Sequence, residues 1–214
     1  MADFLLEFYN EEMPASFLKE SVINIKNLIK RRLIKENIKI EKEDYFFTPK
    51  RIVIVFFNLK LEYEKSKDLI KGPRYDSPEK AIVGFAKSFN TKKNKLIIKN
   101  TEKGKYYFFK KNNRPNIKNL LVTIIEAELK RVAWKKSMKW GNNNLKWARP
   151  LKNILCLYDN KKLTFNIGHL LSTNQTIKDD QLTEKQYRVK SIEHYYSLMK
   201  KFDVIISQKE RKKK

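Results

Sequence analysis

The sequence contains few of the residues from which metal sites, disulfides and reactive centres are usually built. Its 214 residues include one cysteine, two histidines and five glycines. Cys156 has no partner for an intramolecular disulfide, which indicates a reducing compartment, and we expect a cytoplasmic protein. His169, His194 and Cys156 are too few ligands for the usual zinc sites. We therefore expect no metal site.

Nucleotide-binding motifs are also absent from the sequence. Neither G-x-x-x-x-G-K-[ST] nor G-x-G-x-x-G occurs, so no phosphate-cradling loop is predicted and no cofactor is expected on this chain. Glu11 and Glu12 are adjacent carboxylates, but adjacent acids at the start of a helix usually point apart and stabilise the helix dipole. We predict that the chain has no catalytic residue.

Long apolar runs are missing as well. No stretch approaches the ~18 uninterrupted apolar residues of a membrane-spanning helix. The first residues, MADFLLEFYNEEMP, carry acids where a signal peptide needs cations. We therefore expect a soluble protein without a membrane partner.

Positive charge is abundant. The chain holds 48 lysines and arginines against 24 acids, a formal net charge of +24. Polyanions are the natural partners of such a charge. An AT-rich coding sequence could also raise the lysine content, but it should enrich glutamate as well, and the two-to-one imbalance remains. The charge alone does not distinguish tRNA from DNA or from an acidic membrane surface.

The first quarter of the chain reads as a strand, a helix and a second strand, within a chain long enough for one domain or two small ones. The run 3–9 (DFLLEFY) predicts a strand, and the acids before Pro14 predict a helix start. Apolar residues then recur at spacings of three and four as far as Lys35, which predicts one buried stripe. The run 52–61 (IVIVFFNLKL) predicts a buried strand entered at Pro49.

The later elements alternate irregularly between helices and hairpins. They are predicted, in chain order, as a turn at 71–74, a helix from Asp76 to Phe89, a hairpin of 96–98 with 106–109, a helix over 117–134, a hairpin of 153–158 with 163–167 across a turn at 159–162, and a helix from Ser191. Asp76 and Glu79 have the spacing of a capping box. The elements together predict an α+β fold, with mixed strands and hairpins packed on two long amphipathic helices.

The stretch KKSMKWGNNNLKWARPLKNILCLYD, which begins at Lys135, concentrates two of the three tryptophans. Lys135, Lys136 and Lys139 extend the end of the preceding predicted helix, where cations suit the dipole and could meet phosphates. Trp140 and Trp147 could stack on unpaired bases or anchor the loop to the core. We favour anchoring.

A series of short motifs runs through the chain: Asn10-Glu11-Glu12-Met13-Pro14, Pro49-Lys50-Arg51-Ile52, Lys71-Gly72-Pro73, the helix from Ser77 to Phe89, Lys103-Gly104 with Tyr106, Met138-Lys139-Trp140-Gly141, Trp147-Ala148-Arg149-Pro150 and Glu210-Arg211-Lys212. Their order and spacing resemble the beta subunit of the bacterial heterotetrameric glycyl-tRNA synthetase, whose elements read T-E-E-L-P, P-R-R-L, K-G-P, M-R-W-G, F-x-R-P and E-R-K. Each motif alone is weak, but the colinear set is specific. The resemblance is carried by Glu11, Glu12, Pro14, Pro49, Arg51, Gly72, Pro73, Trp140, Gly141, Arg149 and Pro150.

The resemblance implies a role without bond-making chemistry. In such synthetases two alpha and two beta subunits assemble, the alpha subunit activates glycine with ATP, and the beta subunit binds and orients tRNA. It implies an alpha subunit and tRNA-Gly as partners, with ATP used by the alpha subunit. We select Lys135, Lys136, Lys139 and Arg149 as the RNA-facing cations.

The chain departs from the family in two respects. Where the family shows G-H-R-F after an N-x-T-like stretch, this chain has Asn174-Gln175-Thr176-Ile177 followed by Lys178-Asp179-Asp180-Gln181, which puts the role of that element in doubt. The family's beta subunit is several times longer and carries further domains, including an anticodon-binding module. The resemblance therefore assigns residues 1–214 to the N-terminal α+β region, and we expect a fragment or a degenerate gene product.

Two other functions remain open from the sequence. One is a free-standing basic nucleic-acid-binding protein, for which attraction to phosphates would be enough. The other is a pure subunit-interaction domain, whose charge is solvated surface and whose apolar face docks on another subunit.

Overall fold

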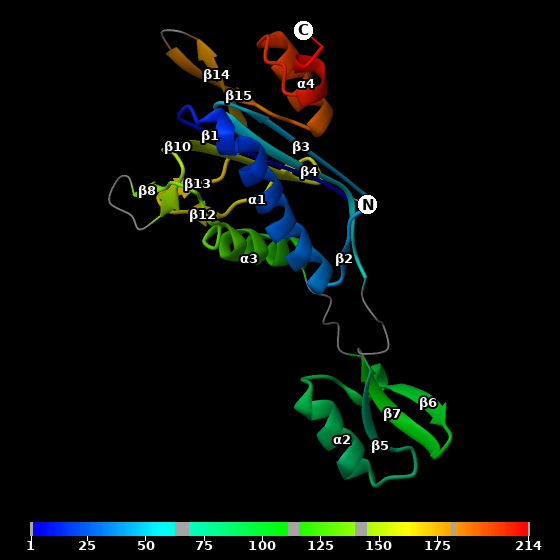
Figure 1. The fold of residues 1–214 in the computed structure, drawn as a ribbon. Helices are drawn as coiled ribbons and strands as arrows, with labels where there is room; N and C mark the ends of the chain where they lie inside the picture. Colours follow the sequence, from blue (N-terminus) through cyan, green and yellow to red (C-terminus); the bar gives the residue numbers. More distant parts are fainter. Residues whose placement is uncertain (1, 63–68, 111–115, 140–144, 181–182, 214) are drawn as a thin grey trace. The chain divides into compact units, whose positions relative to one another are not determined.

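The computed structural model describes residues 2–62, 69–110, 116–139, 145–180 and 183–213. The chain forms two compact units: unit 1 comprises Met1–Glu62 and Asn116–Lys214, and unit 2 comprises Tyr63–Pro115. Unit 2 is thus inserted into the sequence of unit 1. Each unit combines helices with antiparallel strands (Figure 1), which confirms the predicted α+β class.

Unit 1 is built on a six-stranded antiparallel sheet of order β11-β10-β1-β4-β2, in which β3 also pairs with β4. Its strands are β1 (Ala2–Asn10), β2 (Ile38–Lys39), β3 (Lys42–Thr48), β4 (Arg51–Leu61), β10 (Leu151–Tyr158) and β11 (Lys161–Lys162). On the central strand β1, Leu6 lies opposite Ile54 of β4 and Cys156 of β10. The strands predicted at 3–9 and 52–61 are confirmed.

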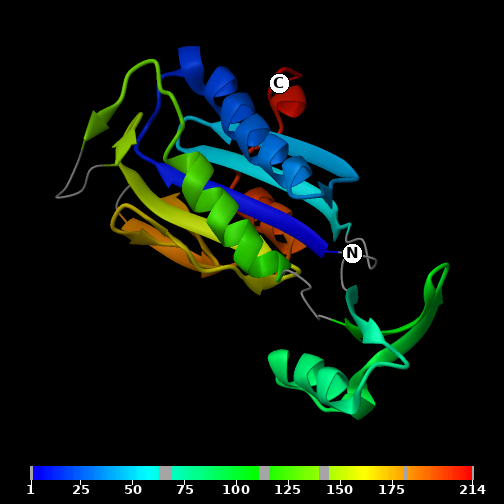
Figure 2. The same cartoon turned by 90° about the horizontal axis from the view of Figure 1, so that it is seen from below.

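Helices cover both faces of this sheet (Figures 1 and 2). The helices of unit 1 are α1 (Ala15–Lys35), α3 (Ile117–Leu129), α4 (Ile192–Lys201) and α5 (Gln208–Arg211). α1 and α3 share a core with Phe4 and Phe8 of β1, whereas α4 packs on the other face with Leu5. Successive residues of a strand point to opposite faces, so two helix layers require a strand that is apolar throughout.

The end of α3 and the role of the acids before α1 differ from the predictions. α3 ends before Trp134 rather than at it. Trp134 instead packs edge-on against Trp147, with ring centroids 4.7 Å apart, so a tertiary contact overrides the helical pattern. α1 begins after Pro14 as expected, but its first turn holds no acid, so Glu11 and Glu12 do not complement its dipole.

The β10 strand turns back more tightly than predicted. Asp159 and Asn160 adopt positive φ angles of 53° and 56°, which suit a two-residue hairpin turn, and β11 follows at once. Residues 163–167 therefore do not form the second strand of this hairpin. Instead, β12 (Asn166–Ile167) pairs with β13 (Leu170–Leu171).

Two further strand pairs of unit 1 were not predicted. β8 (Met138–Lys139) pairs with β9 (Lys146–Trp147), and β14 (Gln175–Asp180) pairs with β15 (Thr183–Arg188). β15 reads TEKQYR and is largely exposed, so it lacks the alternation of apolar and polar residues by which a half-buried strand is recognised.

Unit 2 is a three-stranded antiparallel sheet of order β5-β7-β6 with one α-helix. Its elements are β5 (Leu69–Arg74), α2 (Glu79–Ser88), a 3-10 helix (Lys93–Lys95), β6 (Ile97–Thr101) and β7 (Gly104–Lys110). The predicted hairpin is confirmed as β6–β7. Residues 71–74 lie in β5 rather than in a turn. Pro78 occupies the N-cap of α2 without a side-chain cap, so the capping box predicted from Asp76 and Glu79 is wrong.

Candidate functional site

Three motif segments that are far apart in the sequence meet at one end of the unit 1 sheet. The Glu11 amide donates to the Pro150 carbonyl oxygen over 2.9 Å, and the Met13 amide donates to the Pro49 carbonyl oxygen over 2.8 Å. We name residues 10–14, 49–51 and 147–150 the motif junction. Three other motif residues belong to this junction. Pro14 lies at the N-cap of α1, Arg149 is half-buried and Glu12 is exposed.

Trp147 anchors the motif junction to the core. Its side chain is fully buried, and its indole Nε1–H donates to Asn10 Oδ1 over 2.7 Å. The Asn10 side-chain amide donates in turn to the Phe8 carbonyl oxygen, and the Trp147 and Phe8 rings pack with centroids 5.2 Å apart. Trp147 is therefore an anchor rather than a platform for bases. Trp140 and Gly141 lie outside the described residues.

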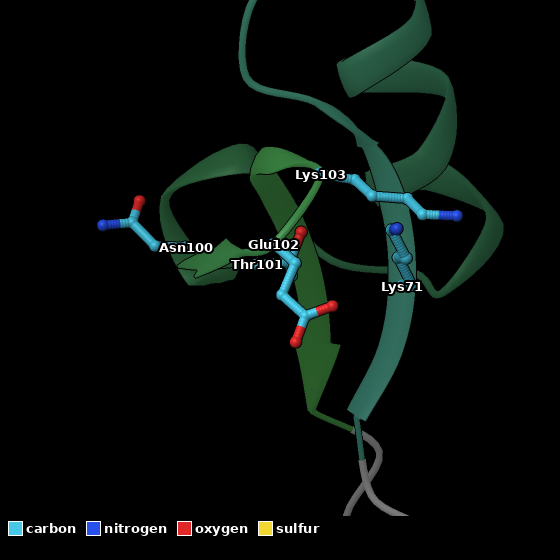
Figure 3. A pocket seen from close by; sticks show the side chains of 5 residues that line it. All are labelled: Lys71, Asn100, Thr101, Glu102 and Lys103. Atoms are coloured by element: carbon cyan, nitrogen blue, oxygen red, sulfur yellow. The ribbon is translucent and has the colours of Figure 1, made fainter.

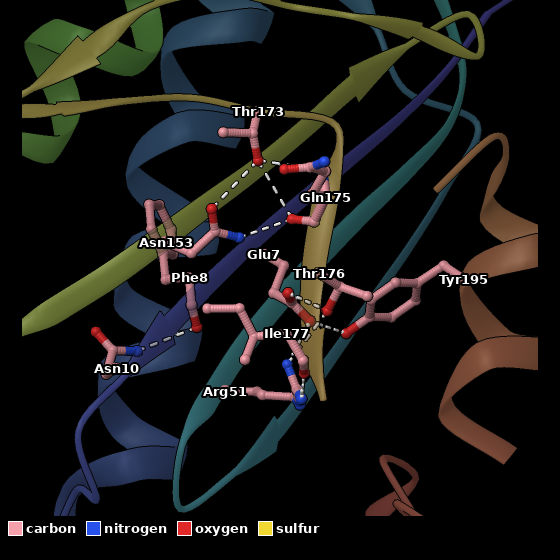
Figure 4. A network of polar contacts seen from close by, with 10 residues as sticks. All are labelled: Glu7, Phe8, Asn10, Arg51, Asn153, Thr173, Gln175, Thr176, Ile177 and Tyr195. Carbon is pink, nitrogen blue, oxygen red and sulfur yellow. Dashed lines mark hydrogen bonds and ion pairs between the residues drawn. The ribbon is translucent and has the colours of Figure 1, made fainter. Parts of the chain in front are cut away.

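A buried polar network lies next to the motif junction (Figure 4). Arg51 Nη1 lies 3.2 Å from Glu7 Oε2, and the Thr176 hydroxyl donates to Glu7 Oε1 over 2.7 Å. The Tyr195 hydroxyl also donates to Glu7, and Arg51 donates to the Ile177 carbonyl oxygen. The network thus joins β1, β4, β14 and α4.

Burial sets the electrostatics of this network. Desolvation by itself would lower the pKa of Arg51, but the Glu7 charge raises it, so the guanidinium keeps its proton. Desolvation, followed by the Glu7 charge, raises the pKa of Tyr195 well above its usual range, so the hydroxyl keeps the proton that it donates. These charges are paired and shielded from solvent, which suits them to hold structure rather than to react with a substrate.

Ion pairs connect the β14–β15 hairpin to the motif junction. Lys152 Nζ lies 2.8 Å from Glu11 Oε1 and 2.5 Å from Glu184 Oε1, and Lys50 pairs with Asp179. Hydrogen bonds to Glu11 and Glu184 raise the pKa of Lys152, and the bond from Lys50 lowers the pKa of Asp179. Each pair is partly exposed and contributes about 0–1 kcal/mol. Their common effect is to hold the hairpin against the junction.

The four predicted RNA-facing cations have different surroundings. Lys135 pairs with Glu20 of α1 over 2.5 Å, and both side chains are exposed. Lys136 is exposed, and Lys139 is exposed on β8. Arg149 belongs to the motif junction. Since α3 ends before all three lysines, the prediction that they extend a helix end is wrong.

The partners of Glu7 could not be read from the sequence. Glu7 itself is recognisable in the sequence, because a lone acid inside an apolar strand needs a partner when it is buried. No sequence pattern indicates Thr176 and Tyr195 as its partners, since they are 169 and 188 residues away from Glu7. Lys146 was also missed, and it lies directly opposite Lys139 in the β8–β9 pair.

The K-G-P motif has a packing role in unit 2. A Cβ atom at Gly72 would lie 2.5 Å from Cε1 of Phe85 on α2. No side chain fits at that distance from a packed ring, so the strand needs glycine at this point. Pro73 is half-buried in the same strand.

The described ranges lack the side-chain groups that a metal site needs and the helices that a membrane span needs. No group of three His, Cys, Asp or Glu side chains there could hold a metal ion. None of the helices in these ranges is long and apolar enough to cross a membrane. Cys156 is fully buried, and desolvation raises the pKa of its thiol well above the usual value, so it is a poor nucleophile.

Comparisons with known proteins agree on one family. The family model described as glycyl-tRNA synthetase beta subunit matches residues 4–214. The glycine-tRNA ligase beta subunits of Rickettsia africae (strain ESF-5) and Rickettsia canadensis (strain McKiel) are 36% and 34% identical to this chain, over 213 and 212 residues. Each alignment covers 99% of this chain and 32% of the relative. The chain thus spans about a third of the length of these curated relatives.

Proposed function

We propose a role in glycyl-tRNA synthesis for this chain, on the premise that it belongs to the glycyl-tRNA synthetase beta subunit family. In this role it binds tRNA-Gly and joins the subunit assembly, while an alpha subunit activates glycine with ATP. The partners are the alpha subunit, in a complex of two alpha and two beta subunits, and tRNA-Gly. The chain itself contributes no catalytic residue.

The observation that carries the proposal is the motif junction. Three of the segments that resemble the family are bonded to one another through their backbones, and Arg51 is paired with the buried Glu7 carboxylate. Residues that are bonded within the fold in this way stabilise the structure of a surface. In the proposed role, another polypeptide carries out catalysis. The net charge of +24 gives that surface a natural polyanionic partner.

The test combines binding with charging. The purified chain is mixed with the alpha subunit and with tRNA-Gly, and complex formation is followed by co-purification and by filter binding. We expect binding to both, and a higher rate of glycine charging than with the alpha subunit alone. A chain that makes about six phosphate contacts should lose roughly a thousandfold in affinity between 50 and 200 mM salt. A basic protein of similar size and net charge serves as the control.

Three outcomes separate this role from its alternatives. Equal binding to tRNA-Gly and to other tRNAs, without alpha-subunit binding, would indicate a free-standing basic nucleic-acid-binding protein. Binding to the alpha subunit without tRNA binding at low salt would indicate a pure interaction domain. Binding to neither partner would contradict the proposed function.

A further inference from the structure

Unit 2 carries the densest positive charge of the chain. Its 53 residues hold 15 lysines and arginines and five acids, which gives +10 of the total +24. Unit 2 is about a quarter of the chain, so its charge per residue is about twice that of unit 1. A polyanion is therefore attracted most strongly to this unit.

The sheet of unit 2 has one face that α2 covers and one that it does not. Tyr107 of β7 belongs to the core formed with α2. Neighbouring residues of a strand point to opposite faces, so Tyr106 and Phe108 lie on the other face. The strand register places Lys99 opposite Tyr106, and Ile97 and Lys71 opposite Phe108. We name these five residues the open face: Lys71, Ile97, Lys99, Tyr106 and Phe108.

The open face combines cations with aromatic rings. Lys71 Nζ lies 3.6 Å from the centroid of the Tyr106 ring, in a cation–π contact. Lys71 and Lys99 are exposed, and Tyr106 and Phe108 are half-buried. Proteins hold unpaired nucleic acid with this combination, because rings stack on bases and cations pair with phosphates. A duplex offers such a surface no free base faces.

A hollow of about 540 Å³ includes Lys71 of the open face and the β6–β7 turn (Figure 3). It is lined by Lys71, Asn100, Thr101, Glu102 and Lys103. The Thr101 hydroxyl donates to the Gly104 carbonyl oxygen over 2.9 Å, which fixes the turn, and Figure 3 shows the Lys103 side chain extending from the turn across β5. This open hollow carries two cations to one acid, so it adds positive charge beside the open face.

We propose that the open face of unit 2 binds an unpaired segment of RNA. The bases stack on Tyr106 and Phe108, and Lys71, Lys99 and Lys103 hold the phosphates. This inference rests on the proposed function, because it names the surface through which the chain holds RNA. An apolar partner would have to remove water from the lysines of the open face, which costs free energy. An acidic partner without aromatic groups would make no use of Tyr106 and Phe108.

The test measures binding of the full chain to a labelled RNA of about 12 nucleotides, single-stranded or as a blunt duplex, at about 50 mM salt. The double variant Lys71→Glu/Lys99→Glu changes the open face. Its matched control, Lys80→Glu/Lys87→Glu, makes the same change of charge at two exposed residues of α2. We expect the open-face variant to bind the single strand at least about tenfold more weakly than the control does. Equal weakening by both variants would overturn the proposal.

A second variant tests stacking without a change of charge. Tyr106→Leu keeps an apolar side chain but removes the aromatic ring. We expect at least about fivefold weaker binding of the single strand and an unchanged affinity for the duplex. Parent-like binding of the single strand, or a duplex bound by the parent as tightly as the single strand, would overturn the proposal. Thermal melting of each variant tests whether it is folded. If Tyr106→Leu does not fold, the comparison of the two double lysine variants decides whether the proposal holds.

The outcomes for the two proposals are separable. If open-face variants bind tRNA-Gly and support charging as the parent does, the inference is wrong and the proposed function stands. If the parent binds the single strand through the open face but binds neither tRNA-Gly nor the alpha subunit, the inference holds and the proposed function is wrong.

Discussion

The guanidinium of Arg51 pairs with the carboxylate of Glu7 across two neighbouring strands, at 3.2 Å and with both side chains buried. Arg51 belongs to a family motif, whereas Glu7 stands outside all of them. The Cζ atom of Arg51 also lies 4.6 Å from the centroid of the Tyr9 ring. A motif arginine on a basic protein could be taken for a phosphate ligand. Here its charge is already paired inside the fold, so Arg51 is not available to a phosphate.

The first prediction concerns this ion pair. Arg51→Met removes the cation and leaves Glu7 buried without its counter-charge, so the free energy of unfolding should fall by about 3–5 kcal/mol. The double variant Glu7→Leu/Arg51→Met buries no charge and should lose less than Arg51→Met alone. Urea denaturation at neutral pH measures both changes.

Lys60→Met on the exposed side of β4 is the control for this substitution, and it should change the stability by less than about 0.5 kcal/mol. If Arg51→Met behaved like this control, the ion pair would not stabilise unit 1.

The strands and helices that pack on both faces of the unit 1 sheet could be predicted because each carries its own pattern. Within the run 52–61, residues 52–57 are all apolar, and α1 repeats its apolar residues every three or four positions. Local patterns cannot reveal where a helix ends for the sake of a distant contact. Trp134 leaves α3 to pack on Trp147, and nothing near Trp134 in the sequence indicates this.

The second prediction concerns the glycine of the K-G-P motif. Gly72→Ala places a Cβ 2.5 Å from the Phe85 ring, so α2 must shift from the sheet, and unit 2 should lose about 1–3 kcal/mol. Hydrogen exchange of the backbone amides in the unit 2 sheet measures this loss. Gly84→Ala is the matched control, because no atom lies within 4 Å of a Cβ at that point of α2. That substitution should stabilise the helix by about 0.5–1 kcal/mol, and an equal loss from both substitutions would contradict the packing role.

The third prediction concerns alkaline pH. Burial, followed by the charge of Asp179, raises the pKa of Tyr9 to about 12, and burial, followed by the charge of Glu7, raises the pKa of Tyr195 well above its usual range. Unfolded tyrosines release their protons near pH 10, whereas the folded chain keeps them, so the unfolded state binds fewer protons above that pH. The contribution of these tyrosines to the stability should therefore be fully present below about pH 10 and be lost as the pH rises toward 12. Tyr195→Phe removes one of these protons, so its stability should fall less steeply than that of the parent. Denaturant titrations at several pH values give both slopes, and parallel slopes would contradict the assignment to Tyr195.

The segment 174–181 shows how a departure from the family pattern can still be built into the fold. Thr176 and the Ile177 carbonyl oxygen both bind Arg51, and Asp179 pairs with Lys50. This segment thus holds β14 against a motif that does match the family. The sequence could not reveal these contacts, because the partners of the segment are more than 120 residues away.

The fourth prediction concerns Lys139 and Lys146, which lie directly opposite each other in the β8–β9 pair. Like charges in this position repel, and opposite charges attract. Lys139→Glu should therefore raise the stability of unit 1 by about 0.2–1 kcal/mol while it weakens binding of tRNA. Lys161→Glu makes the same change of charge on β11, where the opposite residue is Tyr158, and should not raise the stability. Thermal unfolding and filter binding of both variants measure the two effects. If Lys139→Glu destabilised the chain, the repulsion between Lys139 and Lys146 would be contradicted. If it bound tRNA as the parent does, Lys139 would have no part in holding a polyanion.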